Sequence, residues 1–385
     1  MKQLSKIMLA AVASVALAAP AFAWDFGASG SSSATFKQKT VAPASGDATT
    51  TMNFSSLGGG ITLSSSNTDG ANTAAFSYSA GWNDDGGNFD ESISLSGSKK
   101  VGNWTASSST SSYMQKDVIG SASTPQTGKT TAVITLTDGS ITYKLGNAAH
   151  LSTAEKAVNG PMGGAQDAEA SVDAFDGFSV GLGVGPGTLT VALDMHDNSA
   201  DGAATVLGET QASAAGSTGC GAQMTGFGFN FAGDVGADLT FTYGSGGSTI
   251  SAAGCTGDNA SNAWSYNVMG LGVAVPVGGM SIGFDFGTKT SLHTIGTAEG
   301  GSATSGWELS LTMPVGDASA GVNLSSTASI TTTGGVAGDA AVTGGTELWY
   351  TVPIGAVSLS AGYGSAAVVD GTTTSELGAT MSMSF

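Results

Sequence analysis

The chain has 385 residues, of which 60 are Gly and only 10% are charged, whereas an average soluble domain has about 7% Gly and about 25% charged residues. The 29 acidic residues outnumber 11 basic ones, all of them Lys, and the formal charge of −18 excludes a nucleic-acid binder, which needs a basic surface for phosphates. A hydrophobic content of 41% argues against disorder, and two Cys are too few for a disulfide scaffold or a four-Cys zinc site.

The first 23 residues have the pattern of a secretory signal peptide. Lys2 and Lys6 form a positive start, Ile7–Ala19 an apolar stretch, and Ala21–Ala23 a small-x-small cleavage site. The alternative, a transmembrane anchor, needs about 20 apolar residues, and this stretch has 13. Cleavage leaves residues 24–385 with 9 Lys against 29 acids, a formal charge of −20.

The mature sequence alternates with a period of two instead of a helical period. In residues 73–82 the even positions are apolar or aromatic and the residues between them are small or polar (Ala74, Phe76, Tyr78, Ala80 and Trp82 alternate with Ala75, Ser77, Ser79 and Gly81). Such a segment is a β-strand with one apolar face. Because the polar face carries Ser, Thr and Gly in place of many charges, a lipid-facing barrel is favoured over a soluble sandwich.

Eighteen segments have this pattern, and the connections between them alternate in length. Short connections contain Gly and Pro or Asp, whereas long ones, such as 197–222, 245–262 and 288–304, have a dozen or more residues. This asymmetry is typical of outer-membrane barrels. We therefore predict an all-β protein, a transmembrane antiparallel up-and-down β-barrel of 18 strands, or of 16 if 51–65 or 101–113 does not form a full strand. The expected strands are 24–36, 51–65, 72–82, 89–97, 101–113, 130–137, 140–147, 177–185, 187–196, 224–232, 236–244, 263–275, 279–288, 305–314, 318–330, 346–353, 356–364 and 375–385.

One turn unit occurs three times, as Val275–Gly278, Met313–Gly316 and Val352–Gly355. Pro, which lacks an N–H, belongs at the end of a strand, and Gly supplies the unusual φ of a tight turn. The period of 38–39 residues corresponds to one hairpin of the barrel. A β-propeller blade has a similar period, but it would hold four strands without alternating connections.

Two further segments carry a resemblance to a known family. The last strand ends in Phe385, with apolar residues at Leu377, Met381 and Met383, and looks like the assembly signal of bacterial outer-membrane proteins. Gly139–Asn147 resembles the strand that precedes the pore loop in Gram-negative general porins. The resemblance implies an outer-membrane location, contact with lipid and lipopolysaccharide, assembly by the barrel-assembly machinery, and a homotrimer. The chain departs from that family in having no Arg and two more expected strands.

The resemblance also implies a pore-constricting loop, since the long connection 147–176 follows that strand. A barrel of this strand number is too wide for wall side chains to fill, so a loop must narrow it. The polar residues of the predicted constriction loop are His150, Glu155, Lys156, Asp167, Glu169 and Asp173.

Residues flanked by outward apolar neighbours must face the lumen, because side chains alternate along a strand. The residues predicted on this basis to line the pore are Asp25, Lys37, Lys144, Asp194, Asp238, Asp285, Glu308 and Glu376. Acids exceed bases, and fixed negative charge concentrates cations. The sequence therefore predicts a moderate cation preference that fades as salt rises.

Cys220 and Cys255 lie in two successive long connections that are expected on the outer side of the barrel. That location is oxidising, and we predict that they form a disulfide; two free thiols are the alternative. The six Trp lie near strand ends and are predicted to form interfacial girdles, with ordinary strand packing as the alternative (Trp24, Trp82, Trp104, Trp264, Trp307 and Trp349).

The sequence indicates no catalytic, metal or cofactor site. Gly177–Gly181 and Gly279–Gly283 match the G-x-S-x-G pattern of esterases, but both lie within expected strands with no helix after them. The three His are dispersed, without the spacing of a zinc site. We expect a porin for passive diffusion of small hydrophilic solutes. The alternatives are a plugged structural or adhesive surface barrel and a substrate-specific channel.

Overall fold

The computed structural model describes residues 24–83, 88–117, 130–162, 172–194, 197–198, 205–207, 209–210, 222–250, 263–295 and 298–385. The predicted signal peptide, Asp167, Glu169 and both Cys lie outside these residues. In the part that the structure describes, no helix is long and apolar enough to cross a membrane.

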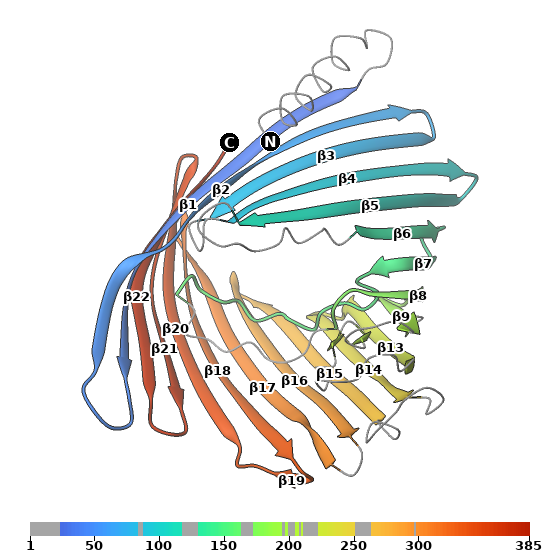
Figure 1. The fold of residues 1–385 in the computed structure, drawn as a ribbon. Helices are drawn as coiled ribbons and strands as arrows, with labels where there is room; N and C mark the ends of the chain where they lie inside the picture. Colours follow the sequence, from blue (N-terminus) through green and yellow to red (C-terminus); the bar gives the residue numbers. More distant parts are fainter. Residues whose placement is uncertain are drawn as a thin grey trace.

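The described residues form a closed antiparallel β-barrel of 18 strands, as predicted (Figure 1). Each strand pairs with the next along the chain, and the first strand also pairs with the last, which closes the barrel. The barrel strands are β1 (Asp25–Ala42), β2 (Thr49–Asp69), β3 (Asn72–Asn83), β4 (Asn88–Val101), β5 (Trp104–Asp117), β6 (Thr130–Thr137), β7 (Ile141–Ala148), β8 (Phe175–Val184), β9 (Gly187–Asp194), β13 (Ala222–Asp234), β14 (Asp238–Ile250), β15 (Ala263–Val277), β16 (Met280–Ile295), β17 (Ala298–Val315), β18 (Ala318–Thr333), β20 (Ala341–Ile354), β21 (Val357–Val368) and β22 (Thr373–Ser384).

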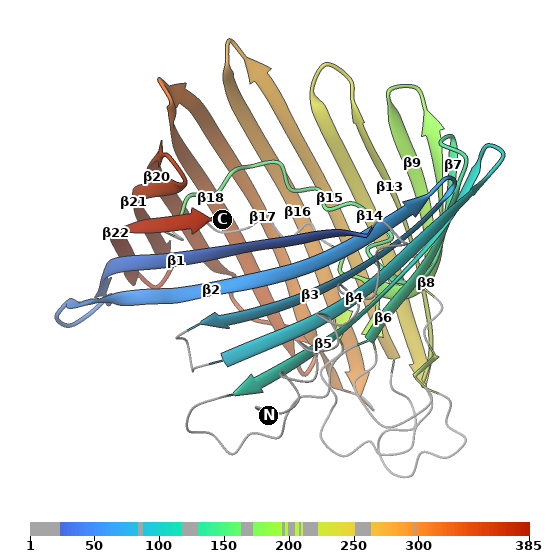
Figure 2. The same ribbon diagram turned by 90° about the horizontal axis from the view of Figure 1, so that it is seen from above.

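Four two-residue strands complete the described structure. β10 (Asp197–Asn198) extends the sheet beside β13, and β19 (Val336–Ala337) extends it beside β18. β11 (Thr205–Val206) and β12 (Glu209–Thr210) pair only with each other. Strands of opposite walls cross at an angle in Figure 2, as the tilted strands of a barrel do.

Several strands are longer than the sequence pattern indicated. The predicted long connection 288–304 was wrong, because β16 continues to Ile295 and β17 begins at Ala298. Thr288 and Thr290 continue the alternation there, and β-branched Thr favours extended backbone. Ladder pairing between β16 and β17 therefore outweighs the low hydrophobicity that suggested a loop.

The three repeated turn units all lie at one edge of the barrel, between β15 and β16, β17 and β18, and β20 and β21. Gly278, Gly316 and Gly355 have φ of 58°, 64° and 66°. This left-handed backbone favours glycine, which is why each unit contains one at the turn.

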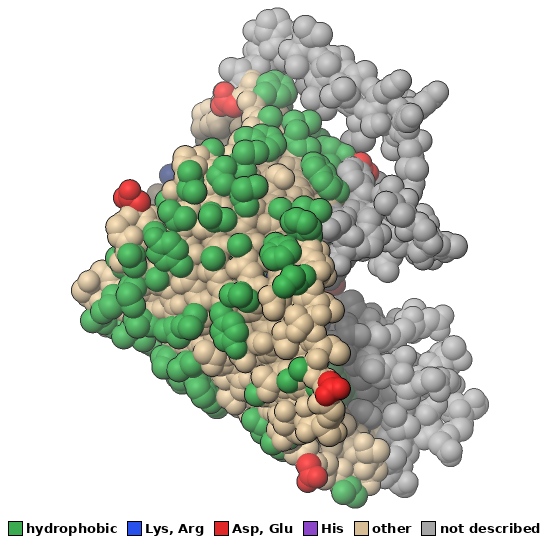
Figure 3. All heavy atoms as spheres, turned by 90° about the vertical axis from the view of Figure 1, so that its left-hand side faces the viewer, with side chains coloured by type: hydrophobic (Ala, Val, Ile, Leu, Met, Phe, Trp, Pro, Cys, Tyr) green, Lys and Arg blue, Asp and Glu red, His purple; other side chains and the backbone are tan. Residues whose placement is uncertain are grey.

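The two faces of the wall differ in chemistry. Along β13, Phe227 and Phe229 are exposed on the outside, whereas Asn230 is buried inside. Figure 3 shows hydrophobic side chains spread over one side of the outer wall and acidic side chains near its edges. An apolar exterior with a polar interior is the arrangement of a barrel surrounded by lipid.

The barrel closes where its two ends meet. The backbone of Phe385 forms two hydrogen bonds with Gly30, with N–O distances of 2.7 and 3.0 Å. The Phe385 ring occupies the space that a Cβ at residue 30 would need. Leu377, Met381 and Met383 lie exposed on the outer face of β22. The role of these residues as an assembly signal stays a prediction.

Candidate functional site

Residues 149–162, which follow β7, run along the inner face of the barrel wall. Figure 1 and Figure 2 both show this green segment inside the barrel, running from the side of β7 toward β20. It forms hydrogen bonds with inward side chains of β8, β14, β16, β17, β18 and β20. The segment therefore covers one side of the lumen.

Asp285 of β16 is the first strong anchor of this segment. Its carboxylate accepts the backbone N–H groups of Lys156, at 2.7 and 2.8 Å, and of Ala157, at 2.7 Å. The segment can approach the wall closely here because Gly272 has no side chain; a Cβ at that position would overlap the carbonyl oxygen of Ala154. Asp285 is 1% exposed, so the segment covers this predicted pore-lining carboxylate.

Glu347 of β20 is the second anchor, and sequence reasoning missed it. This fully buried carboxylate accepts the N–H groups of Gly160 at 2.9 Å and Met162 at 2.6 Å. The sequence did contain a signal for it. Glu347 directly precedes Leu348, which faces outward, so alternation along the strand predicts that Glu347 faces inward. Glu308, which was predicted to face inward, precedes Leu309 in the same way. Between the two anchors, Ser310 Oγ accepts the N–H of Val158 at 2.8 Å.

A buried polar row on β17 and β18 supports the middle of the segment. Asn323 donates to the carbonyl of Val158 at 3.1 Å and to Asn159 Oδ1 at 3.0 Å. It also donates to Glu308, which is 1% exposed. Glu308 was predicted to line the pore; it faces inward and lies under the segment.

The other predicted pore-lining residues also have inward parity, but most have partners. Asp238 lies 2.8 Å from Lys156, and Glu376 lies 2.7 Å from Lys37. Asp194 accepts the N–H of Leu207 at 2.6 Å. On the same face, Lys144 of β7 is half-buried and Asp25 is exposed at the start of β1.

His150 fixes the start of the segment. Its Nε2–H donates to the carbonyl of Gly146, and its Nδ1 accepts from the Ser179 hydroxyl, both at 2.9 Å. The ring lies 4.7 Å from that of Phe175. Burial lowers the pKa of His150 below its ordinary value, which favours the neutral imidazole. Two other residues of the predicted constriction loop, Glu155 and Asp173, are exposed.

Part of the interior is apolar. A cluster of buried side chains joins the wall to Leu151 within the segment 149–162 and to Val172 and Leu207 after it (Leu151, Val172, Phe175, Ala192, Leu207, Trp264, Tyr266 and Val268). The predicted girdle position is wrong for Trp264 and Trp349, because both are buried with inward parity. Trp264 instead donates its indole N–H to Ser291 Oγ at 2.8 Å.

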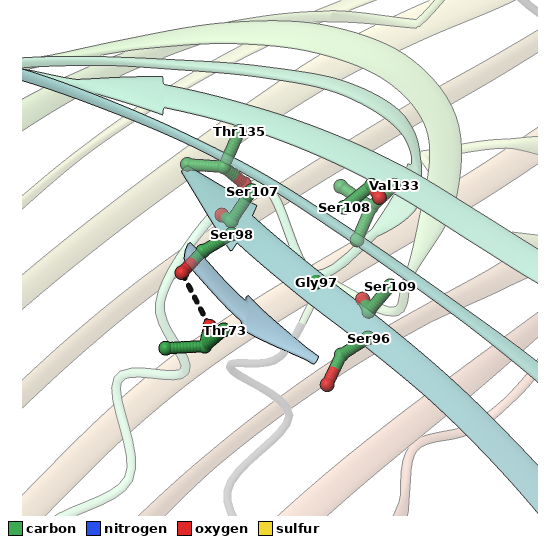
Figure 4. A pocket seen from close by; sticks show the side chains of 9 residues that line it. All are labelled: Thr73, Ser96, Gly97, Ser98, Ser107, Ser108, Ser109, Val133 and Thr135. Atoms are coloured by element: carbon green, nitrogen blue, oxygen red, sulfur yellow. Dashed lines mark hydrogen bonds between the residues drawn. The ribbon is translucent and has the colours of Figure 1, made fainter. Parts of the chain in front are cut away.

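The opposite wall, formed by β3–β6, is lined by hydroxyl groups. A cavity lies on this inner face, and Figure 4 shows the side chains that line it, among them Thr73 and Ser98, which form a hydrogen bond of 2.6 Å. Its lining residues are Thr73, Ser96, Gly97, Ser98, Ser107, Ser108, Ser109, Val133 and Thr135. The lumen thus has one wall covered by a docked segment and another that presents neutral polar groups.

No protein-family model and no curated protein sequence matches the chain. Among solved structures, an anion-selective porin from Comamonas acidovorans aligns with a TM-score of 0.50 and 12% identity over 94% of this chain and 100% of that one. The outer-membrane channel DcaP of Acinetobacter baumannii aligns with a TM-score of 0.51 and 8% identity over 94% of this chain and 97% of that one. OmpT of Vibrio cholerae, in its trimer form, aligns with a TM-score of 0.50 and 8% identity over 94% of this chain and 100% of that one. Over nearly its whole length, the chain has the fold of Gram-negative outer-membrane porins and channels.

Proposed function

We propose that the protein is a porin of a Gram-negative outer membrane, with a water-filled lumen for passive diffusion of small hydrophilic solutes and ions. The observation that carries this proposal is the segment 149–162, held against one inner wall by Asp285 and Glu347 while the β3–β6 wall presents hydroxyl groups. A segment fixed along one wall narrows a channel, and the hydroxyl groups of the other wall suit hydrated solutes.

We also propose a modest preference for cations. Without the predicted signal peptide, the chain carries a formal charge of −20. Lys37 and Lys156 lie in ion pairs with acids, whereas Asp285 is bonded to neutral backbone amides, which leaves a negative balance near the lumen. The Comamonas neighbour is named anion-selective, so the sign of selectivity does not follow from the fold.

A homotrimer belongs to the same proposal, since the solved OmpT structure is described as a trimer form. Surrounding lipid, lipopolysaccharide and the barrel-assembly machinery are the other expected partners. No catalytic role is proposed. Ser179 and His150 are in contact, but both are buried, and the second ring nitrogen of His150 binds a backbone carbonyl, not an acid.

Single-channel recording in planar bilayers tests the proposal. The purified barrel should give ohmic current steps in symmetric KCl, and a KCl gradient should give a reversal potential of the cation-selective sign that shrinks as salt rises. A folded barrel without steps would instead support a plugged barrel, for which the apolar interior cluster is the favouring observation. An anion-selective sign would refute the charge argument alone. Liposome swelling with sugars of graded size would reveal a substrate-specific channel, because transport would then not follow size.

A further inference from the structure

In the connection between β9 and β13, Leu207 is buried inside the barrel. This residue lies at the turn between β11 and β12. Its side chain is 0% exposed, and its backbone N–H donates to Asp194 of β9 at 2.6 Å. A second stretch of chain, separate from residues 149–162, is therefore fixed to the inner wall.

Leu207 inserts into an apolar socket with two kinds of walls. One wall belongs to the barrel, where a Cβ at Gly244 would lie 2.8 Å from the Leu207 side chain. Ala192, Tyr266 and Val268 continue this side. The other wall comes from Leu151 and Val172 of the connection between β7 and β8 and from Phe175 at the start of β8, which belong to the same buried cluster; Val172 lies 3.6 Å from the position of the same Gly244 Cβ. Leu207 therefore joins the β7–β8 connection to the barrel.

The backbone at Leu207 is strained. Among the described residues, it is the one residue other than Gly with a positive φ, at 52°. This left-handed region is unfavourable for a residue with a side chain, whereas Gly enters it freely. A strained residue persists where its surroundings hold it, and such residues are found at clamps and switches. Here a buried side chain and the Asp194 hydrogen bond hold it.

We infer that Leu207 is a positioning residue, a clamp that keeps the start of the segment 149–162 pressed against the barrel wall. The carboxylates Asp285 and Glu347 hold the later part of the segment, from Lys156 to Met162. Leu207 acts at the other end, through the buried cluster that contains both Leu207 and Leu151. The width of the channel is then set by the β7–β8 connection together with Leu207 of the β9–β13 connection. This inference rests on the proposed function.

Leu207→Asp and Leu207→Gly test the clamp. Asp places a charge in the apolar socket, and Gly removes the side chain while accepting the backbone conformation. Both should replace the single conductance level of the unmodified protein with a broader set of levels and a higher mean. Recording in 1 M KCl, where the Debye length is about 3 Å, suppresses any direct effect of the added charge.

Val336→Asp is the matched control, because Val336 lies on another connection and is 71% exposed. It should leave the conductance histogram unchanged, and so should Leu207→Met, which keeps an apolar side chain of similar size. The inference is overturned if Leu207→Asp and Leu207→Gly fold to heat-stable barrels with the unmodified conductance. It is also overturned if neither variant folds, since Leu207 then serves barrel formation. Absence of channels in the unmodified protein would count against the proposed function instead.

Discussion

Replacing Glu347 with Gln should loosen the end of the segment 149–162. The fully buried carboxylate accepts two backbone N–H groups, from Gly160 at 2.9 Å and from Met162 at 2.6 Å. A Gln side chain has the same shape but puts an NH₂ group where one carboxylate oxygen was. A donor then faces a donor, and one of the two buried N–H groups loses its acceptor.

The expected magnitude follows from these two contacts. A hydrogen bond to a charged group contributes about 1.5–3 kcal/mol, and a buried donor without an acceptor costs about 1–3 kcal/mol. With one bond lost and the other weakened by loss of the charge, the docked state should lose about 2–4 kcal/mol. Since about 1.4 kcal/mol is a factor of ten, the population of the undocked state should rise about 30-fold to 1,000-fold.

Hydrogen–deuterium exchange with mass spectrometry measures this change directly. The peptide that contains Gly160 and Met162 should exchange faster in Glu347→Gln by a factor in that range, while strand peptides keep their protection. Glu91→Gln is the matched control, because Glu91 of β4 accepts a hydrogen bond of 2.7 Å from Tyr78 of β3, away from the segment. Equal exchange of the segment in both variants would refute the assignment of Glu347 as its anchor.

Three further predictions concern the same segment. Because burial lowers the pKa of His150 in the docked segment, His150 binds a proton more readily when the segment is undocked. Docking should therefore be most stable above about pH 6.5 and weaken as the pH falls. Hydrogen exchange of the segment, corrected for its intrinsic rate, should be faster at pH 5.5 than at pH 7.5, and His150→Gln should remove the difference. Gly272→Ala should displace the segment, since the added Cβ overlaps the Ala154 carbonyl, and unchanged single-channel conductance would contradict this. Lys156→Gln removes a partly exposed ion pair with Asp238 and should cost less than about 1 kcal/mol, so a large drop in the thermal stability of the barrel would be inconsistent.

The sequence by itself determined the architecture of the barrel. Alternation along a strand is a local property, so the outward position of Phe227 and the inward position of Asp285 could be read from their neighbours. Tight turns such as that at Gly278 depend on a few adjacent residues and were equally readable. The number of strands follows from counting these local units.

The local sequence pattern gave wrong predictions for one connection and for side chains that fill the wide interior of the barrel. Within the polar stretch 288–304, β16 continues to Ile295 and β17 begins at Ala298, because these two strands pair with each other. Trp264 was predicted at the membrane interface, but it is buried inside, where it packs beside Tyr266 and donates to Ser291. Periodicity gives the face of a side chain only when the register of apolar neighbours is clear.

Only the tertiary structure decided how the lumen is organised. Gly160 and Glu347 are 187 residues apart in sequence, and Lys156 and Asp285 are 129 apart, so no local pattern links them. Parity identified Asp285 as inward-facing, but not that it would be covered. Backbone N–H groups that leave water must find acceptors, and inward carboxylates at the right height of the wall provide them. Which acceptors are reached depends on the path of the chain through the closed barrel, and that path exists only once the barrel has formed.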